Sequence, residues 1–252
     1  MSRLGVIVNA DDLGISEAVN HATFELMAKG RISSATIMAN GPAVQHAVRF
    51  ARRFPACSFG VHLNLTQFEP LTGGSRARLL IDDCGQMSRA NKRIKLTTER
   101  LRAMYEELCA QIDHLVALGV NVSHLDSHNH IHTRPTLFPA LKNVQRRYGI
   151  RRVRLSKNFY SRDRPCAPGL QWKKDAFNWA LKSIYRTRTT DVFTEFLTYW
   201  HADPVRRRSA GLIELMVHPG AASAREETTI LEGDGLAGAG LHLPLIPYSR
   251  LS

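Results

Sequence analysis

Short β-rich runs alternate with longer amphipathic segments along nearly the whole chain, and this alternation limits the possible folds strongly. Strands are expected at Leu4–Ala10, Ala35–Asn40, Ser58–Leu65, Val122–Ser127, Arg152–Leu155, Leu212–Val217 and Leu241–Tyr248. Helices are expected at Ser16–Lys29, Ala43–Arg53, Thr97–Leu118, Pro135–Tyr148, Lys173–Arg186 and Asp191–Ala202. Such alternation predicts an α/β fold with parallel strands and helices outside them, either as a closed barrel or as a doubly wound sheet.

No break in composition divides residues 1–252, so we expect a single domain. Two loop excursions interrupt the alternation. The first, near residues 66–96, contains Gly73-Gly74 and a short hairpin expected at Leu79–Met87. The second, near residues 157–171, contains Pro165 and Pro168. Long loops on the carboxyl side of parallel strands commonly shape a substrate cleft.

The segment His124–His132 places four imidazoles and one carboxylate within nine residues, directly after an apolar run. Histidine titrates near neutrality, so its ring nitrogens can serve as metal ligands or proton carriers. Acidic and imidazole side chains also follow other expected strands. Because the carboxyl ends of parallel strands converge on one face, we expect one site there. Its candidate members are Asp11, Asp12, His62, His128 and His218.

Two imidazoles and one carboxylate, with positions left open for water and substrate, form a competent catalytic metal site. A divalent ion there can polarise a carbonyl and lower the pKa of a water molecule. Imidazoles favour zinc-like ions, whereas a carboxylate with open water positions also accepts magnesium. We therefore expect one divalent cation, Mg²⁺ or Zn²⁺. A bend at the strand end would turn both Asp11 and Asp12 toward the site.

Four motifs carry a family resemblance. They are N-A-D-D-L-G at 9–14, G-V-H-L-N-L-T at 60–66, H-L-D-S-H-N-H-I-H at 124–132 and M-V-H-P-G at 216–220. Together, and in this order, they resemble the YdjC-like carbohydrate deacetylases, which include chitooligosaccharide deacetylases and hopanoid-associated deacetylases. The resemblance implies a distorted, seven-stranded (β/α) barrel related to polysaccharide deacetylases.

The resemblance also implies roles for individual residues. It assigns the metal to Asp12, His62 and His128, the activation of water to Asp11, and protonation of the leaving amine to His218.

Other side chains near the motifs have less defined expectations. His130 and His132 are left to line the cleft as substrate contacts or to brace it, and either could replace His128 as a ligand. Asp126 is expected to orient a ligand imidazole rather than to bind the metal. His124 is expected to pack in the core. At their spacings, the tryptophans are expected in helix cores, although they could stack on sugar rings: Trp172, Trp179 and Trp200.

These features predict a metal-dependent amidohydrolase, acting on linear amides, that removes acetyl from an N-acetylated sugar and releases acetate. Two alternatives stay open. The same barrel and metal could support sugar isomerisation or phosphoester cleavage, or the protein could be a non-catalytic carbohydrate- or polyanion-binding protein. A paired base beside an open metal site weighs against a pure binding protein.

The formal net charge of +12, with basic residues concentrated between Lys142 and Arg164, bears on partners. Such a field attracts acidic glycans, lipid-linked sugars or an anionic membrane surface, although a solvated basic face would look the same in sequence. No nucleic-acid module is recognisable, and a homodimer is left open. The N-terminus turns acidic at Asp11, before a secretory leader could fit, so we expect a cytoplasmic protein.

Overall fold

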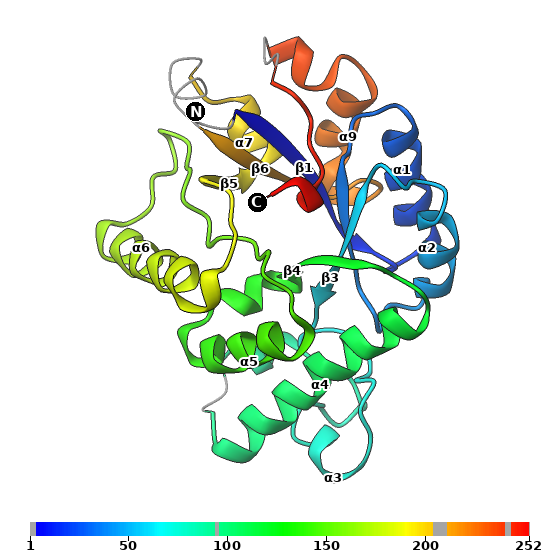
Figure 1. Ribbon diagram of the computed structural model, residues 1–252, viewed down its shortest axis with the longest axis vertical. Helices are drawn as coiled ribbons and strands as arrows, with labels where there is room; N and C mark the ends of the chain where they lie inside the picture. Colours follow the sequence, from blue (N-terminus) through cyan, green and yellow to red (C-terminus); the bar gives the residue numbers. More distant parts are fainter. Residues whose placement is uncertain (1–3, 94–95, 204–210, 240–242, 252) are drawn as a thin grey trace.

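The computed structural model describes residues 4–93, 96–203, 211–239 and 243–251. Its centre is a sheet of parallel strands in the order β4-β3-β2-β1-β6-β5. The strands are β1 (Gly5–Leu13), β2 (Ser34–Ile37), β3 (Ser58–Leu63), β4 (Val122–Ser127), β5 (Val192–Glu195) and β6 (Leu212–Val217). Figure 1 shows helices around the outside of this sheet, which confirms the expected α/β arrangement.

The main helices are α1 (Glu17–Ala28), α2 (Val44–Ala51), α3 (Gly74–Ala77), α4 (Thr98–Ala117), α5 (Phe138–Tyr148), α6 (Pro168–Ser183), α7 (Phe196–Trp200) and α9 (Arg225–Glu232). Capping side chains set several of their ends. Ser16 Oγ accepts a hydrogen bond from the Val19 amide, and Thr97 Oγ1 accepts one from the Arg100 amide, each at 3.2 Å. These bonds satisfy amides that have no partner inside the helix.

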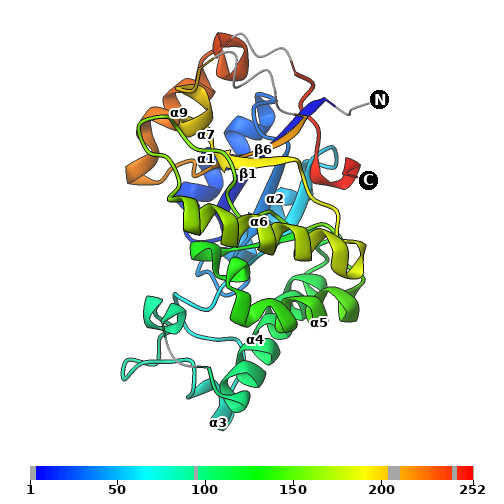
Figure 2. The same ribbon diagram turned by 90° about the vertical axis from the view of Figure 1, so that its left-hand side faces the viewer.

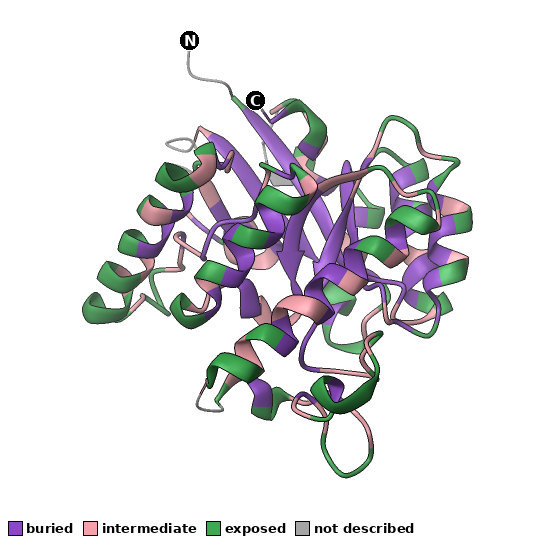
Figure 3. Cartoon of the chain, turned by 60° about the horizontal axis from the view of Figure 1, so that its bottom comes forward, coloured by how far each residue is buried: buried purple, intermediate pink, exposed green. Residues whose placement is uncertain are grey.

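The strands are buried on both faces, as expected where helices cover a parallel sheet. Every residue of β6 is buried, and so is almost all of β1. Figure 3 shows this core as a continuous buried layer, with helices that are buried on one side and exposed on the other. A sheet enclosed in this way fixes the positions of the side chains at its strand ends.

The expected seventh strand is not confirmed. The segment expected as strand Arg152–Leu155 makes only isolated parallel bridges, from Val153 to Leu125 and from Arg152 to Arg188. This segment therefore lies between β4 and the residues that precede β5, but it does not form a continuous strand with either. The described strands form a six-stranded curled sheet.

Two other expectations need correction. The prediction of a helix at Asp191–Ala202 was wrong in its first half. Val192–Glu195 pairs with β6 as strand β5, and within this segment only Phe196–Trp200 is helical. Of the expected Leu241–Tyr248 strand, residues 241–242 lie outside the described residues, and Leu245 makes a single bridge to Val6. Prolines at 244 and 247 cannot donate to a ladder, which limits pairing there.

The first loop excursion contains the expected hairpin as one antiparallel bridge between Ile81 and Met87. The second ends at residue 167, because α6 begins at Pro168 rather than at Lys173. α6 lies at the outer edge of the molecule in Figure 1 and faces the viewer in Figure 2. Among the described helices, none combines the length and apolar character needed to cross a bilayer.

Candidate active site

The end of β1 is bent so that both neighbouring aspartates reach the same region. Its pairing with β2 becomes irregular between Ala10 and Leu13, and Asp12 adopts a left-handed backbone with φ of 62°. A bulge of this kind redirects side chains at a strand end. A strained backbone at a non-glycine residue often marks a functional position. This geometry supplies the bend that the Asp11-Asp12 pair requires.

Asp12, His62 and His128 come together at the carboxyl ends of three strands. Asp12 Oδ1 lies 3.1 Å from His62 Nε2 and 2.8 Å from His128 Nδ1. Burial would raise the pKa of Asp12, but hydrogen bonds from His128 and His62 lower it far below its usual range. One ionised carboxylate oxygen facing two imidazole nitrogens is a donor set that fits a divalent cation.

Asp126 holds His62 in the orientation that this set needs. His62 Nδ1 donates to Asp126 Oδ1 at 2.8 Å, which leaves Nε2 facing Asp12. The Thr36 hydroxyl donates to the other Asp126 oxygen at 2.9 Å. Burial opposes protonation of His62, but Asp126 and Asp12 raise its pKa well above the usual value. A carboxylate behind a ligand imidazole is a recurring feature of metal centres.

Asp11 forms a buried ion pair with Arg154. Arg154 Nη1 and Nη2 each donate to one oxygen of Asp11, both at 2.6 Å. Nη1 also lies 2.8 Å from Asp126 Oδ2, and Nε donates to Glu214 Oε1 at 2.6 Å. Burial would raise the pKa of Asp11, but Arg154 lowers it far below normal. The carboxylate is therefore held ionised, the form able to accept a proton.

Asp11 and Asp12 share a cavity of about 300 Å³ with His218 and the turn that follows it. His218 directly follows β6, and its amide donates to the buried Glu227 at 2.5 Å. His218 thus lines the same small hollow as the two aspartates. The structure brings together all five residues expected at this site.

The remaining histidines of the His124–His132 run differ in whether their ring nitrogens have partners. His130 Nδ1 is buried and has no hydrogen-bond partner among the described residues. Burial lowers the pKa of His130 to about 4, so its ring is neutral and can accept or donate one hydrogen bond. Its unused nitrogen fits the expected substrate contact.

His132 and His124 have internal partners instead. His132 Nδ1 lies 2.5 Å from Ser127 Oγ, and Nε2 lies 3.2 Å from the Arg154 carbonyl. These contacts favour the expectation that His132 braces the cleft over the expectation that it contacts substrate. His124 is fully buried and stacks on Tyr248 with ring centroids 3.7 Å apart, as expected for a core residue.

Arg154 and Glu214 were missed as functional residues. Arg154 counted in sequence only as part of a basic cluster, yet it is fully buried, and so is Glu214. Tyr248 donates a hydrogen bond to the second oxygen of Glu214, and burial raises the pKa of Glu214 to about 7. The available signal was a charge inside an apolar run, in Val153-Arg154-Leu155 and Leu212–Val217, since unpaired buried charges are costly.

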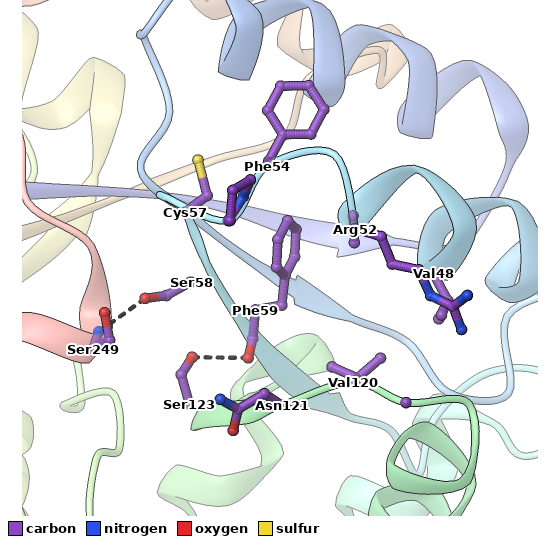
Figure 4. Close-up of a pocket in the computed structure, with 13 residues that line it drawn as sticks. Val48, Arg52, Phe54, Cys57, Ser58, Phe59, Val120, Asn121, Ser123 and Ser249 are labelled. Atoms are coloured by element: carbon purple, nitrogen blue, oxygen red, sulfur yellow. Dashed lines mark hydrogen bonds between the residues drawn. The ribbon is translucent and has the colours of Figure 1, made fainter.

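Another cavity, of about 330 Å³, lies at the opposite ends of β3 and β4. Figure 4 shows its lining, where Ser123 Oγ donates to the Phe59 carbonyl and the Ser249 amide donates to Ser58 Oγ. These residues lie at the amino ends of the strands. Catalytic residues of parallel barrels gather at the carboxyl ends, so this cavity is not the candidate active site.

Two further groups of side chains have metal-compatible spacing. In the first, Asp11, His62 and Asp126, the two carboxylates are already paired with Arg154. The second, Glu17, His21 and His46, lies on the α1–α2 surface, where His46 Nδ1 is 3.1 Å from the Asn20 amide nitrogen. Neither offers the buried, open donor set found around Asp12.

Comparison with known proteins adds independent information. A family model described as YdjC-like protein matches residues 5–242. A carbohydrate deacetylase of Vibrio cholerae serotype O1 is 38% identical over 145 residues, 58% of this chain and 56% of that protein. One from Geobacillus stearothermophilus is 37% identical over 153 residues, 60% of each. The chain therefore spans less than two thirds of the length of these curated relatives.

A solved structure from Enterococcus faecalis V583, provisionally described as a cellobiose-phosphate cleavage protein, superposes with a TM-score of 0.79. The match covers 100% of both chains at 21% identity. At this identity the likeness supports the fold and says nothing about the reaction.

Proposed function

The chain belongs to the YdjC-like protein family, and on that basis we propose that it is a metal-dependent carbohydrate deacetylase. The observation that supports this most strongly is the convergence of Asp12, His62 and His128 beside a cavity that also contains Asp11 and His218. The proposed reaction cleaves the C–N bond of an N-acetyl amino sugar with water, giving acetate and a free amine.

Asp12, His62 and His128 would hold one divalent cation, Mg²⁺ or Zn²⁺. When bound, the ion would polarise the acetyl carbonyl and make a water molecule more acidic. Asp11, which Arg154 holds ionised and in place, would take the proton from that water. His218, which lines the same cavity, would supply a proton to the departing nitrogen.

His130 completes the proposed site. Its buried, unpartnered Nδ1 would form a hydrogen bond with a sugar hydroxyl. A buried polar atom without a partner is costly, so a substrate hydroxyl that satisfies it would be favoured. Asp126 and Arg154 would act through their contacts with His62 and Asp11, by holding these side chains in place.

The proposed substrate class includes sugars that carry a negative charge. A cavity of about 700 Å³ is lined by Arg89, Lys92, Arg93 and Arg134, together with Asn129, which directly follows His128. Burial and the three neighbouring arginines lower the pKa of Lys92, and among the described residues no acidic side chain lines the cavity. An anionic group on the glycan would compensate this charge.

Acetate release tests the proposed activity. We would screen N-acetylglucosamine oligomers, lipid-linked amino sugars and acidic glycans, and assay ketose and phosphate formation in parallel to detect isomerase or phosphoesterase activity. Asp12→Ala and His128→Ala should each abolish metal binding and acetate release. Unchanged turnover in both variants would eliminate the proposed site. Arg134→Gln should raise KM for an anionic sugar and leave KM for its neutral analogue unchanged.

A further inference from the structure

Helix α6 has apolar side chains on two opposite faces. Phe177 and Leu181 are buried against the core, as in any amphipathic surface helix. On the other side, Trp172 and Trp179 are 71% and 72% exposed. They are seven residues apart, two helical turns, so both project from the same outward face. Sequence analysis placed these tryptophans in a helix core, and the structure contradicts that expectation.

The outward stripe continues along the helix with mostly small residues. Asp175, three residues after Trp172 and four before Trp179, adds one acidic side chain to it, which accepts a hydrogen bond from Gln171 Nε2 at 2.8 Å. Pro168 and Ala176 are four residues before and after Trp172, and Ser183 is four after Trp179, all on the same face by helical spacing. Trp200, by contrast, is half-buried and packs on the core. A pair of large aromatic rings left exposed on one stripe indicates an interaction surface.

The helix is held firmly on the protein, so this stripe is not a loosely placed segment. Lys142 of α5 is buried and donates hydrogen bonds to the carbonyls of Leu181 and Ile184, each at 2.9 Å. Near the other end, Lys174 donates to the Tyr160 hydroxyl at 2.5 Å. α6 therefore presents its tryptophans from a fixed support.

Positive charge surrounds the stripe. Residues 161–186 contain six basic residues and two acidic ones. Exposed cations lie before the helix, on its flanks and after it, at Arg162, Arg164, Lys173, Lys182 and Arg186. Two copies facing each other through this surface would bring like charges together, which disfavours self-association.

We propose that α6 is a docking helix for an anionic lipid bilayer. Tryptophan prefers the headgroup level of a membrane, where its ring is partly apolar and its N–H stays hydrated. Lysine and arginine around it attract anionic headgroups. A helix with aromatic residues outward and cations beside them lies in the plane of the interface without crossing it. This inference goes beyond the proposed deacetylation and does not depend on it.

Co-sedimentation with vesicles tests the proposal. The wild-type protein should bind vesicles of phosphatidylcholine mixed with phosphatidylglycerol, bind phosphatidylcholine alone much more weakly, and dissociate as salt is raised. Trp172→Ala/Trp179→Ala should reduce binding about tenfold or more. Lys173→Gln/Lys182→Gln should weaken binding to the anionic vesicles only. Val116→Ala is the matched control, because Val116 is an exposed apolar side chain on α4 and should bind like wild type.

Three results from the binding experiments would overturn the proposal. They are absence of wild-type binding to anionic vesicles at low salt, equal binding by the double tryptophan variant, and self-association that the same variant abolishes. Both tryptophan side chains are largely exposed, so the variant should melt like wild type. In a Trp200→Phe background, tryptophan emission should shift to the blue on adding anionic vesicles, and an unshifted spectrum would also contradict docking.

Discussion

Among individual side chains, Arg154 connects the largest number of charged groups in the site. It contacts Asp11, Asp126 and Glu214, and through the first two it supports both the proposed base and the imidazole of His62. A buried cation shared by three carboxylates is costly to disturb, because each carboxylate left behind loses its compensating charge. The position of this arginine therefore sets both the stability and the geometry of the site.

Replacing Arg154 with Met should lower the free energy of unfolding by about 3–5 kcal/mol, since it leaves buried carboxylates unpaired. Urea denaturation measures this change. Arg151→Met is the control, because Arg151 is exposed, and it should cost under about 0.5 kcal/mol. Equal losses in the two variants would show that the buried ion network does not contribute as described.

Glu227 should make stability depend on pH. Burial raises its pKa from 4.5 to about 7, so the folded protein binds this proton more tightly than the unfolded chain. The contribution of this tighter proton binding to folding stability is complete below pH 4.5 and is lost as the pH rises through about 7. Glu227→Gln stays neutral and can still accept the hydrogen bond from the His218 amide.

The variant should therefore gain stability over wild type between pH 5 and pH 8, by up to about 3 kcal/mol. Denaturation curves at both pH values measure the difference. A constant difference across this range would mean that Glu227 does not titrate as the structure implies.

Among the strands, the close approach of β3 and β4 depends on Gly60. A Cβ at this position would lie 2.6 Å from the His124 carbonyl and 2.7 Å from its ring. Gly60→Ala should therefore push the strands apart, with a cost of about 1–3 kcal/mol, and weaken metal binding at His62, two residues along the same strand. Calorimetric titration with Zn²⁺ and denaturation measure both effects.

Gly169→Ala is the matched control, because nothing lies within 4 Å of a Cβ there. It should leave metal affinity unchanged. If Gly60→Ala bound Zn²⁺ as wild type does, the strand spacing would not control the ligand geometry.

The elements differ in how far sequence could predict them. Val122–Ser127 and Leu212–Val217 have the bounds expected. Each run begins shortly after a glycine, at 119 and 211, and glycine marks turns rather than strand interiors. The Val192–Glu195 strand was not separable from the helix that follows it, since no turn residue lies between them. The inward orientation of the Arg154 side chain was also not predictable, because it depends on contacts with residues far away in the sequence, such as Asp11.

The residues of the site itself were more predictable than the residues that hold them in place. Acidic and imidazole residues at strand ends are recognisable because parallel strands place those ends together. The outward direction of Trp172 and Trp179 was not predictable from spacing, because α6 is apolar on both sides and either face could have packed inward.

For the protein as a folded unit, metal binding should raise stability. An ion that binds the folded site and not the unfolded chain adds about 2.7 kcal/mol at a concentration one hundred times its Kd. Adding Zn²⁺ or Mg²⁺ to chelator-treated protein should therefore raise Tm, and the Asp12→Ala variant should show no such rise. An equal rise in both proteins would place the responsible ion elsewhere.

The most direct measurement is an anomalous difference map from crystals soaked in Zn²⁺. The account predicts one strong peak about 2.0–2.2 Å from Asp12 Oδ1, His62 Nε2 and His128 Nδ1, lost in Asp12→Ala crystals. A map with no peak between these three atoms, or with its main peak bound by other residues, would contradict it.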